Sequence, residues 1–256
     1  MLLELPEKIE EVYYCDLSRE QKELYRAVFY SEKESLVKEL SDPHSSKGYI
    51  HIFSVLSKLK QICNHPVMIN KDYENFLKYR SGKWDLFVER LAEARESGQK
   101  VVVFSQYLEM MDMIEKYLTL EKIGFAEIRG STRNRREAIE RFRDDPECEV
   151  FVASLQAAGS GIELTAASVV IHYDRWWNPA KENQATDRVH RIGQQRGVQV
   201  FKFVTKKSVE ERIHELIEKK NRLFASVVGY DPQDQIKTLS RQEMLELVAH
   251  LEKDID

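Results

Sequence analysis

The sequence has few cysteines and no long apolar run. Its 256 residues include three cysteines, Cys15, Cys63 and Cys148, which stand far apart and form no C-x-x-C pair. This spacing indicates reduced thiols and argues against a disulfide framework or a zinc site, so we expect no metal ligands here. No apolar stretch approaches the roughly 20 residues of a membrane-spanning helix, and the start MLLELPEKIEE does not resemble a signal peptide. We therefore expect an intracellular protein that binds no membrane.

A strong excess of charge of one sign is also absent. The formal net charge is −4, although 32% of the residues are charged. This balance argues against a protein coated by nucleic acid, but local groups of basic residues can still contact phosphate. The hydrophobic fraction of 42% is sufficient for a sizeable core.

The sequence lacks the motifs that hold a nucleotide and its magnesium ion. A P-loop needs G-x-x-x-x-G-K-[ST]. The only Gly-Lys pair, Gly82-Lys83, is followed by Trp84, and Leu77 stands where the first glycine should be. No apolar strand ends in an acidic pair, since Asp144-Asp145 ends a predicted helix. We therefore expect that this chain alone neither binds nor hydrolyses a nucleotide.

From about residue 82, short apolar segments alternate with amphipathic ones. Strands are predicted at residues 101–104, 125–128, 149–153, 168–173 and 198–204. Continuous apolar strands that alternate with helices predict an α/β fold, with a parallel sheet covered on both faces. By contrast, the first 70 residues are predicted to be mainly helical, with Ser18 and Gln21 at capping-box spacing. Ser208 and Glu211 repeat this spacing and open a helix that is predicted to end at Gly229.

The loops at the carboxyl ends of the strands are the expected place for a ligand. They are Ser105-Gln106, Arg129–Thr132 and the segments 154–165 and 174–179. Small and hydroxyl residues with exposed amides suit contact with phosphate, although glycines also simply permit tight turns. Six arginines lie between residues 129 and 143. They form either a solvated helix face or, at its start, contacts to nucleic-acid phosphates.

Six segments in order resemble the second RecA-like lobe of the SWI/SNF (Snf-two) helicase-like ATPases of superfamily two. They are LKQICNHP (59–66), KVVVFSQY (100–107), RGST (129–132), AAGSGIELTAAS (157–168), WWNP (176–179) and DRVHRIGQ (187–194). RNA helicases of the DEAD type share HRIG, but they typically continue with arginine at the position of Gln194 and lack WWNP. The resemblance implies a segment joining from the first lobe with a helical protrusion over 1–70, a linker over 71–82, a RecA-like parallel sheet flanked by helices over 83–207, and C-terminal brace and tail helices over 208–256.

In this family ATP lies between two lobes. The resemblance implies that ATP and Mg²⁺ are held mainly by a first lobe outside this chain. Arg188 and Arg191 correspond to arginine fingers that approach the γ-phosphate, and such fingers accelerate phosphoryl transfer by about 10³ to 10⁵. Gln184 is expected near the nucleotide, and Gly159 and Gly161 should let the backbone of their loop approach it closely.

The resemblance places double-stranded DNA along further loops. The expected contacts are Ser105, Gln106, Arg129, Gly130, Ser131, Arg133, Ser154 and Trp177. Trp176 is assigned to the core, and His190 either orients its loop or is structural. The chain departs from the family at Gln156, where a basic residue is common, and at Glu163, where asparagine is frequent. Glu163 would repel DNA if it faced the phosphate backbone.

The leading hypothesis is the C-terminal half of a DNA-dependent ATPase and translocase that remodels protein–DNA complexes. Its partners would be duplex DNA, the N-terminal RecA-like lobe of the same polypeptide and DNA-bound target proteins. The isolated chain is expected to be inactive. We expect it in the cytoplasm or nucleoid of a prokaryote, or in the nucleus of a eukaryote. Two alternatives stay open. One is a stand-alone DNA-binding or protein-interaction module, and the other is the second lobe of a DEAD-type RNA helicase.

Overall fold

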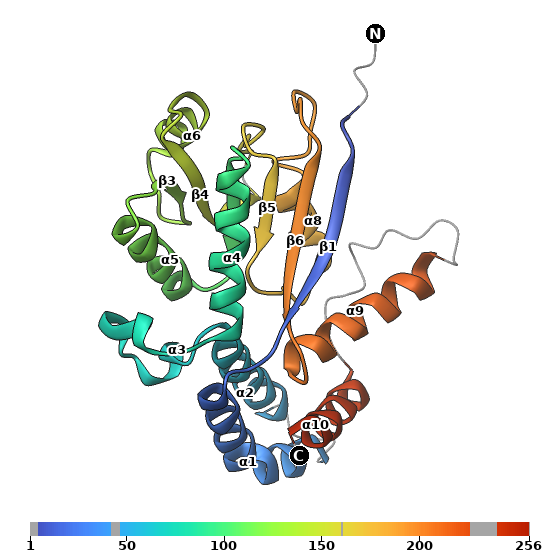
Figure 1. The fold of residues 1–256 in the computed structure, drawn as a ribbon. Coiled ribbons are helices and arrows are strands. Elements are labelled where there is room, and N and C mark those ends of the chain that lie inside the picture. Colours follow the sequence, from blue (N-terminus) through green and yellow to red (C-terminus); the bar gives the residue numbers. More distant parts are fainter. Residues whose placement is uncertain (1–4, 42–46, 160, 226–239, 256) are drawn as a thin grey trace. The chain divides into compact units, whose positions relative to one another are not determined.

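The computed structural model describes residues 5–41, 47–159, 161–225 and 240–255 (Figure 1). Its elements in chain order are β1 (Lys8–Cys15), α1 (Arg19–Ser41), α2 (Lys47–Asn64), α3 (Val67–Asn70), η1 (Tyr73–Lys78), α4 (Gly82–Glu96), β2 (Val101–Ser105), α5 (Leu108–Leu120), β3 (Gly124–Ile128), α6 (Arg135–Asp144), β4 (Cys148–Ser154), α7 (Leu155–Ala158), β5 (Val169–His172), α8 (Pro179–Thr186), β6 (Val198–Thr205), α9 (Val209–Ala225) and α10 (Arg241–Ile255). Within these ranges no helix has the length and apolar character needed to cross a membrane.

The chain forms two compact units. The first unit contains the chain up to Tyr13 together with residues 86–203, and the second contains residues 14–85 and 204 onward. Every predicted strand is present, and each begins and ends within one residue of its predicted bounds. The prediction of a mainly helical first segment was incomplete, because residues 8–15 form β1.

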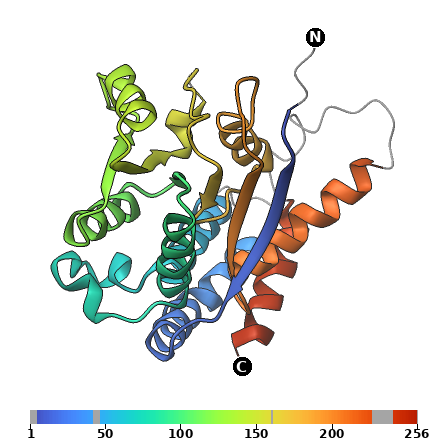
Figure 2. The same ribbon diagram turned by 45° about the horizontal axis from the view of Figure 1, so that its top comes forward.

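The sheet has the strand order β1-β6-β5-β2-β4-β3. Pairs β2·β4, β2·β5, β3·β4 and β5·β6 are all parallel, which confirms the predicted parallel sheet. β1 lies beside β6 although nearly 200 residues separate them (Figure 2), and the Val198 amide donates to the Glu7 carbonyl at 2.9 Å. The sequence did not reveal β1 because its first four residues are exposed and include Lys8, Glu10 and Glu11. An exposed edge strand has no continuous apolar run.

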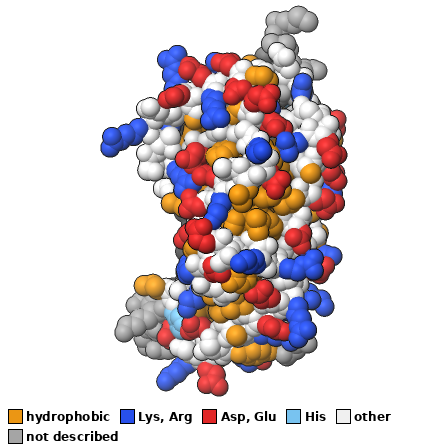
Figure 3. Space-filling model, turned by 60° about the vertical axis from the view of Figure 1, so that its left-hand side comes forward, with side chains coloured by type: hydrophobic (Ala, Val, Ile, Leu, Met, Phe, Trp, Pro, Cys, Tyr) orange, Lys and Arg blue, Asp and Glu red, His pale blue; other side chains and the backbone are white. Residues whose placement is uncertain are grey.

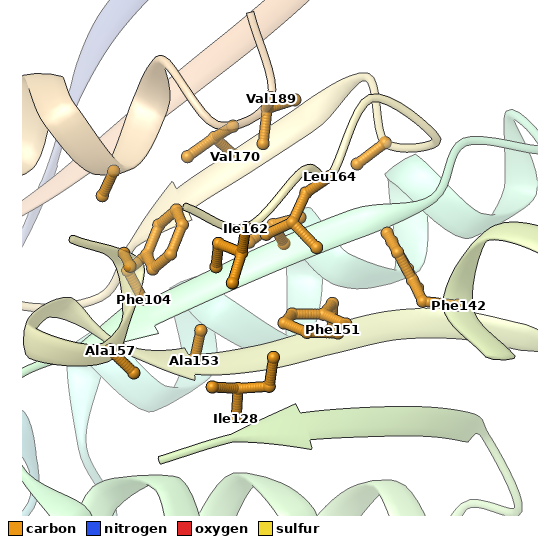
Figure 4. Close-up of a cluster of buried hydrophobic side chains, with 14 of the residues drawn as sticks. Phe104, Ile128, Phe142, Phe151, Ala153, Ala157, Ile162, Leu164, Val170 and Val189 are labelled. Carbon is orange, nitrogen blue, oxygen red and sulfur yellow. The ribbon is translucent and has the colours of Figure 1, made fainter. Parts of the chain in front are cut away.

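The core explains why the central strands are so apolar. All five residues of β2 and all four of β5 are buried. Helix α4 lies in front of the sheet and α8 behind it (Figure 1). On the face near α6 and α8, side chains such as Phe104, Ile128 and Phe151 pack with Phe142 and Val189 (Figure 4). Trp176 packs against the same cluster, which confirms its assignment to the core.

In the second unit, the predicted cap of α1 is confirmed. The Ser18 amide donates to Gln21 Oε1 at 3.0 Å, and the Gln21 amide donates to Ser18 Oγ at 3.1 Å. The cap predicted at Ser208 is different. Ser208 Oγ accepts from the Glu210 amide at 3.1 Å, and the carboxylate of Glu211 accepts from the Lys207 amide at 2.7 Å. The predicted end of that helix at Gly229 lies outside the described residues.

A buried ion pair joins the start of α4 to the start of α9. The ammonium of Lys83 donates to both carboxylate oxygens of Glu210, and neither side chain has exposed surface. Lys83 also donates to Asn64 Oδ1 at 3.0 Å, and Glu210 accepts from the Thr205 amide at 3.0 Å. Burial lowers the pKa of Lys83, but the Glu210 carboxylate and the nearby thiols raise it by more than burial lowers it. The net shift of this pKa is therefore upward. This lysine is therefore fully charged in the interior.

Candidate nucleotide and nucleic-acid interface

The candidate site of the first unit is built from the loops that follow adjacent parallel strands. The pairings Ser105↔Ser154 and Phe104↔His172 place the carboxyl ends of β2, β4 and β5 side by side. The loops that follow these strands therefore begin at one edge of the sheet. This is the edge at which open α/β sheets bind ligands.

Arg188 is held against the loop after β4 by backbone oxygens. Its Nε donates to the Ala158 carbonyl at 2.9 Å, and Nη2 donates to the Gly159 carbonyl at 3.3 Å. Arg191 lies three residues further and is half-buried. Neither guanidinium forms an ion pair with any carboxylate in the described part of the chain. Both arginines therefore keep their positive charge for another ligand.

Gly159, whose carbonyl oxygen Arg188 contacts, lies close to Gln184, another residue predicted to lie near a nucleotide. A Cβ atom placed on Gly159 would lie 3.6 Å from Gln184 Oε1, so this glycine faces the exposed Gln184 side chain. Gly161 has φ +62°, a left-handed conformation that a side chain would strain. An arginine without a carboxylate partner among the described residues, beside the exposed backbone of Gly159, fits a phosphate-bearing group.

The loop that carries the arginines is fixed by its own polar residues. The buried Gln194 donates from Nε2 to the carbonyls of Ala167 at 2.8 Å and Val189 at 3.1 Å. Its Oε1 accepts from the amides of Gln195 and Arg196 at 2.9 Å each. An arginine at position 194, as in DEAD-type helicases, could not accept these last two bonds.

His190 has a structural partner in the same unit. Its Nε2 lies 2.7 Å from the Pro6 carbonyl oxygen, so the ring donates to the N-terminal segment. Because this bond ties the arginine loop to the segment before β1, it supports the structural interpretation of His190. The loop is consequently held in place before any ligand binds.

Ser105 and Gln106, predicted to contact DNA, have an internal partner. The buried Asp174 accepts from Ser105 Oγ, and it accepts from Gln106 Nε2 at 2.7 Å and from the Gln106 amide at 3.2 Å. Ser154 is also buried, and its hydroxyl caps α7 by accepting from the Ala157 amide at 3.2 Å. These three side chains organise the loops from inside. Their contact with DNA stays a prediction.

Arg129, at the end of β3, is surrounded by carboxylates. Its guanidinium lies 2.6 Å from Asp112, from Glu115 and from Glu127. Burial raises the pKa of Glu115 to about 8, and the neighbouring Glu127 adds to this rise. A guanidinium that already has three acidic partners is a poor phosphate ligand. The neighbouring residues predicted to contact DNA are exposed; they are Gly130, Ser131 and Arg133.

The segment between β5 and α8 contains a second buried ion pair. Arg175 Nε donates to Glu182 Oε1 at 3.0 Å, and the Arg175 and Glu182 side chains are 2% and 0% exposed. Trp177 follows and is half-buried. Asn178 caps α8 by accepting from the Ala180 amide at 2.9 Å.

Sequence reasoning missed Asp174, Arg175 and Glu182 as parts of this site. The signal that could have found them is the charged pair Asp174-Arg175, which directly follows an apolar strand and precedes two tryptophans. Charged residues at such a place are buried only when they are paired.

The surface carries charges of both signs. On the face in Figure 3, Lys and Arg side chains are interspersed with Asp and Glu, and neither sign forms a continuous patch among the described side chains. Attraction of a polyanion over this whole face is therefore not expected, in agreement with the net charge of −4. Contact with phosphate must depend on local groups.

The parallel sheet and the arginine-bearing loop at its carboxyl edge define a helicase-type C-terminal lobe. The family model described as Helicase conserved C-terminal domain matches residues 82–193, and that of the SNF2-related domain matches residues 2–68. The chain belongs to the SWI/SNF-related (SNF2) family of helicase-like proteins, and it contains the C-terminal RecA-like lobe.

Similar proteins support this assignment. The Bacillus subtilis protein named ATP-dependent helicase/translocase YwqA is 39% identical over 253 residues, which are 96% of this chain and 26% of that protein. The solved SWI2/SNF2 ATPase C-terminal domain of Sulfolobus solfataricus is 32% identical with a TM-score of 0.70, over 94% of this chain and 98% of that one. The Sulfolobus ATPase core in complex with dsDNA is 34% identical with a TM-score of 0.72, over 94% of this chain and 50% of that one. This chain spans about a quarter of the length of the curated relatives it matches.

Proposed function

We propose that this chain is the C-terminal half of an ATPase that moves along double-stranded DNA and remodels protein–DNA complexes. Arg188 and Arg191 act on ATP that is held, with Mg²⁺, mainly by the N-terminal lobe of the same polypeptide. The observation that carries the proposal is the environment of these two arginines, because Arg188 is oriented by two carbonyl oxygens and neither side chain pairs with a described carboxylate.

This environment suits the chemistry of phosphoryl transfer. Negative charge spreads over the oxygens of the transferred group, and a rigid guanidinium that retains its charge stabilises it. Carbonyl oxygens fix the guanidinium of Arg188 without neutralising it. Arg129 provides the contrast within the same unit, because the carboxyl groups of Asp112, Glu115 and Glu127 surround it.

For the DNA partner, the exposed residues beyond β3 and the aromatic residue before α8 support contact with a duplex backbone. The proposed contacts with accessible groups are Gly130, Ser131, Arg133 and Trp177. Duplex DNA is favoured over RNA because a similar SWI2/SNF2 core was solved with dsDNA. The proteins that are remodelled or displaced are those bound to that DNA.

The proposal is tested by ATP hydrolysis of the full polypeptide with and without duplex DNA. We expect strong stimulation by DNA, and Arg191→Ala should lower the stimulated rate by about 10³ or more while DNA binding persists. Arg136→Ala is the matched control, because the Arg136 side chain is exposed on the outer face of α6 and pairs only with Glu140 at i,i+4 among the described residues. Near-normal turnover of Arg191→Ala would contradict the assignment.

The same assay separates the alternatives. Stimulation by RNA but not by duplex DNA would favour a DEAD-type helicase. An inactive full polypeptide, with salt-sensitive duplex binding by this chain alone, would favour a DNA-binding module. Hydrolysis by this chain alone would reveal a nucleotide site that the sequence does not show.

A further inference from the structure

Glu182 binds two successive residues of the segment between β5 and α8. One oxygen, Oε1, accepts from Arg175 Nε at 3.0 Å and from the Trp176 amide at 2.7 Å. The Glu182 side chain is completely buried. Burial raises the pKa of this carboxyl, but the Arg175 guanidinium and other donors more than offset the rise, so its pKa lies below the usual range. The pair is therefore ionised inside the protein, and it fixes the first turn of α8 to the segment before it.

The two ends of this connection continue into the rest of the site. On one side, the Arg175 carbonyl accepts from Gln106 Nε2 at 3.2 Å, which ties the segment to the loop after β2. On the other side, Thr186 Oγ1 lies 2.9 Å from His172 Nε2, which fixes the last turn of α8 to the end of β5. Helix α8 thus has a buried polar attachment in its first half and another at its end.

The connection lies between the residues assigned to different ligands. Trp177, the proposed DNA contact, is two residues after Arg175. Gln184 and Arg188, on the nucleotide side, are two and six residues after Glu182. When Trp177 moves, the segment that is hydrogen-bonded to Glu182 therefore moves with it. Because Glu182 belongs to α8, this movement shifts α8 and with it Arg188.

A role in stability alone is a poor explanation for this pair. Removing two charges from water is costly, and an apolar pair of similar volume is often at least as stable. What a buried ion pair with a shared backbone bond provides is one defined geometry. In this place, that geometry sets the position of a DNA-facing loop relative to a nucleotide-facing helix.

We propose that Arg175 and Glu182 are positioning residues that transmit duplex binding at the Trp177 segment to the arginines acting on ATP. This inference rests on the proposed function. It concerns stimulation by DNA, and neither side chain touches DNA or nucleotide.

The test uses the full polypeptide and a linear DNA duplex, with the ratio of DNA-stimulated to DNA-independent ATP hydrolysis as the readout. Glu182→Gln keeps the size of the side chain but leaves the guanidinium of Arg175 without its carboxylate. The double variant R175Q/E182Q removes both charges. The glutamine introduced at position 175 places its amide nitrogen where the arginine has Nε, because the two side chains are equally long up to that atom. The bond to residue 182 can therefore form again.

A matched control is available in the same unit. Arg95 Nε and Nη2 donate to Glu149 at 2.9 and 3.0 Å, but this pair is about one-third exposed and lies at the amino end of β4, away from the candidate loops. Glu149→Gln should leave the ratio unchanged. Thermal unfolding of every variant sets an assay temperature at which all are fully folded.

We expect Glu182→Gln to lower the ratio about tenfold or more, because small misplacements far from the reacting atoms can cost about 100-fold. R175Q/E182Q should recover most of the loss. A wild-type ratio for Glu182→Gln would overturn the inference and leave the proposed function standing, as would equal losses in Glu182→Gln and Glu149→Gln. A wild-type enzyme that DNA does not stimulate would overturn both.

Discussion

The buried pair Lys83–Glu210 in the second unit allows a quantitative test of how this fold is held together. Lys83→Met removes the ammonium and leaves the Glu210 carboxylate, without exposed surface, beside the Thr205 amide. Glu210→Gln leaves the ammonium with Asn64 Oδ1 and a neutral amide. Each change leaves one buried charge without the opposite charge that it pairs with in the wild-type chain.

The expected magnitudes follow from that geometry. Breaking a buried ion pair by removing one partner costs about 3–5 kcal/mol of unfolding free energy. The double variant K83M/E210Q buries no charge, and the amide oxygen that it introduces at position 210 can still accept from the Thr205 amide. The bond from Lys83 to Asn64 Oδ1 is still lost, at a cost of about 1–3 kcal/mol. The double variant should therefore be more stable than either single variant.

Urea unfolding of this chain, followed by circular dichroism, measures these differences. Lys58→Met is the control, because Lys58 pairs with Glu32 while its side chain is 45% exposed, and such surface pairs contribute about 0–1 kcal/mol. Two results would refute the reasoning. One is a cost below about 1 kcal/mol for Lys83→Met. The other is a double variant whose cost equals the sum of the single costs, which would mean that the two groups do not interact.

Three further predictions concern other buried groups. The pKa of Glu115 is about 8 in the folded chain and ordinarily 4.5, so the folded state binds this proton more tightly and stability should fall as the pH rises from about 5 to about 8. Glu115→Gln should remove that part of the pH dependence of unfolding, and an unchanged profile would contradict the pKa. Gln194→Leu leaves two buried carbonyls and two amides without their partner and should lower the unfolding free energy by about 3 kcal/mol, whereas Gln195→Leu, at an exposed position, should have little effect. The three cysteines are buried and free, so a thiol reagent should label them only as fast as the chain unfolds, and rapid labelling of the native chain would count against this packing.

The sequence predicted the strands of the sheet well where both faces of a strand are buried. Residues 101–104 are apolar without interruption because helices cover both sides of β2, and such a run is visible in the sequence. Strand β1 escaped prediction since it lies at the edge, where its charged side chains reach water. The cap at Ser18 was predictable because both partners lie within four residues.

For the candidate site, too, one part could be predicted from the sequence and another could not. The positions of its loops followed from the sequence, because parallel strands end at a common edge. The state of each charge did not follow. Arg129 and Arg188 cannot be distinguished in the sequence. In the structure, acidic side chains from α5 and β3 surround Arg129, whereas backbone carbonyl oxygens accept hydrogen bonds from Arg188.

The sequence by itself determined the α/β class, the family and the order of the loops, because these depend on local periodicity and on short motifs. Only the tertiary structure decided which charged residues are buried and paired, as Lys83 with Glu210 and Arg175 with Glu182. The physical reason is that desolvation and Coulomb attraction depend on neighbours in space. Lys83 and Glu210 are 127 residues apart in the chain, so no local sequence pattern predicts that they form an ion pair.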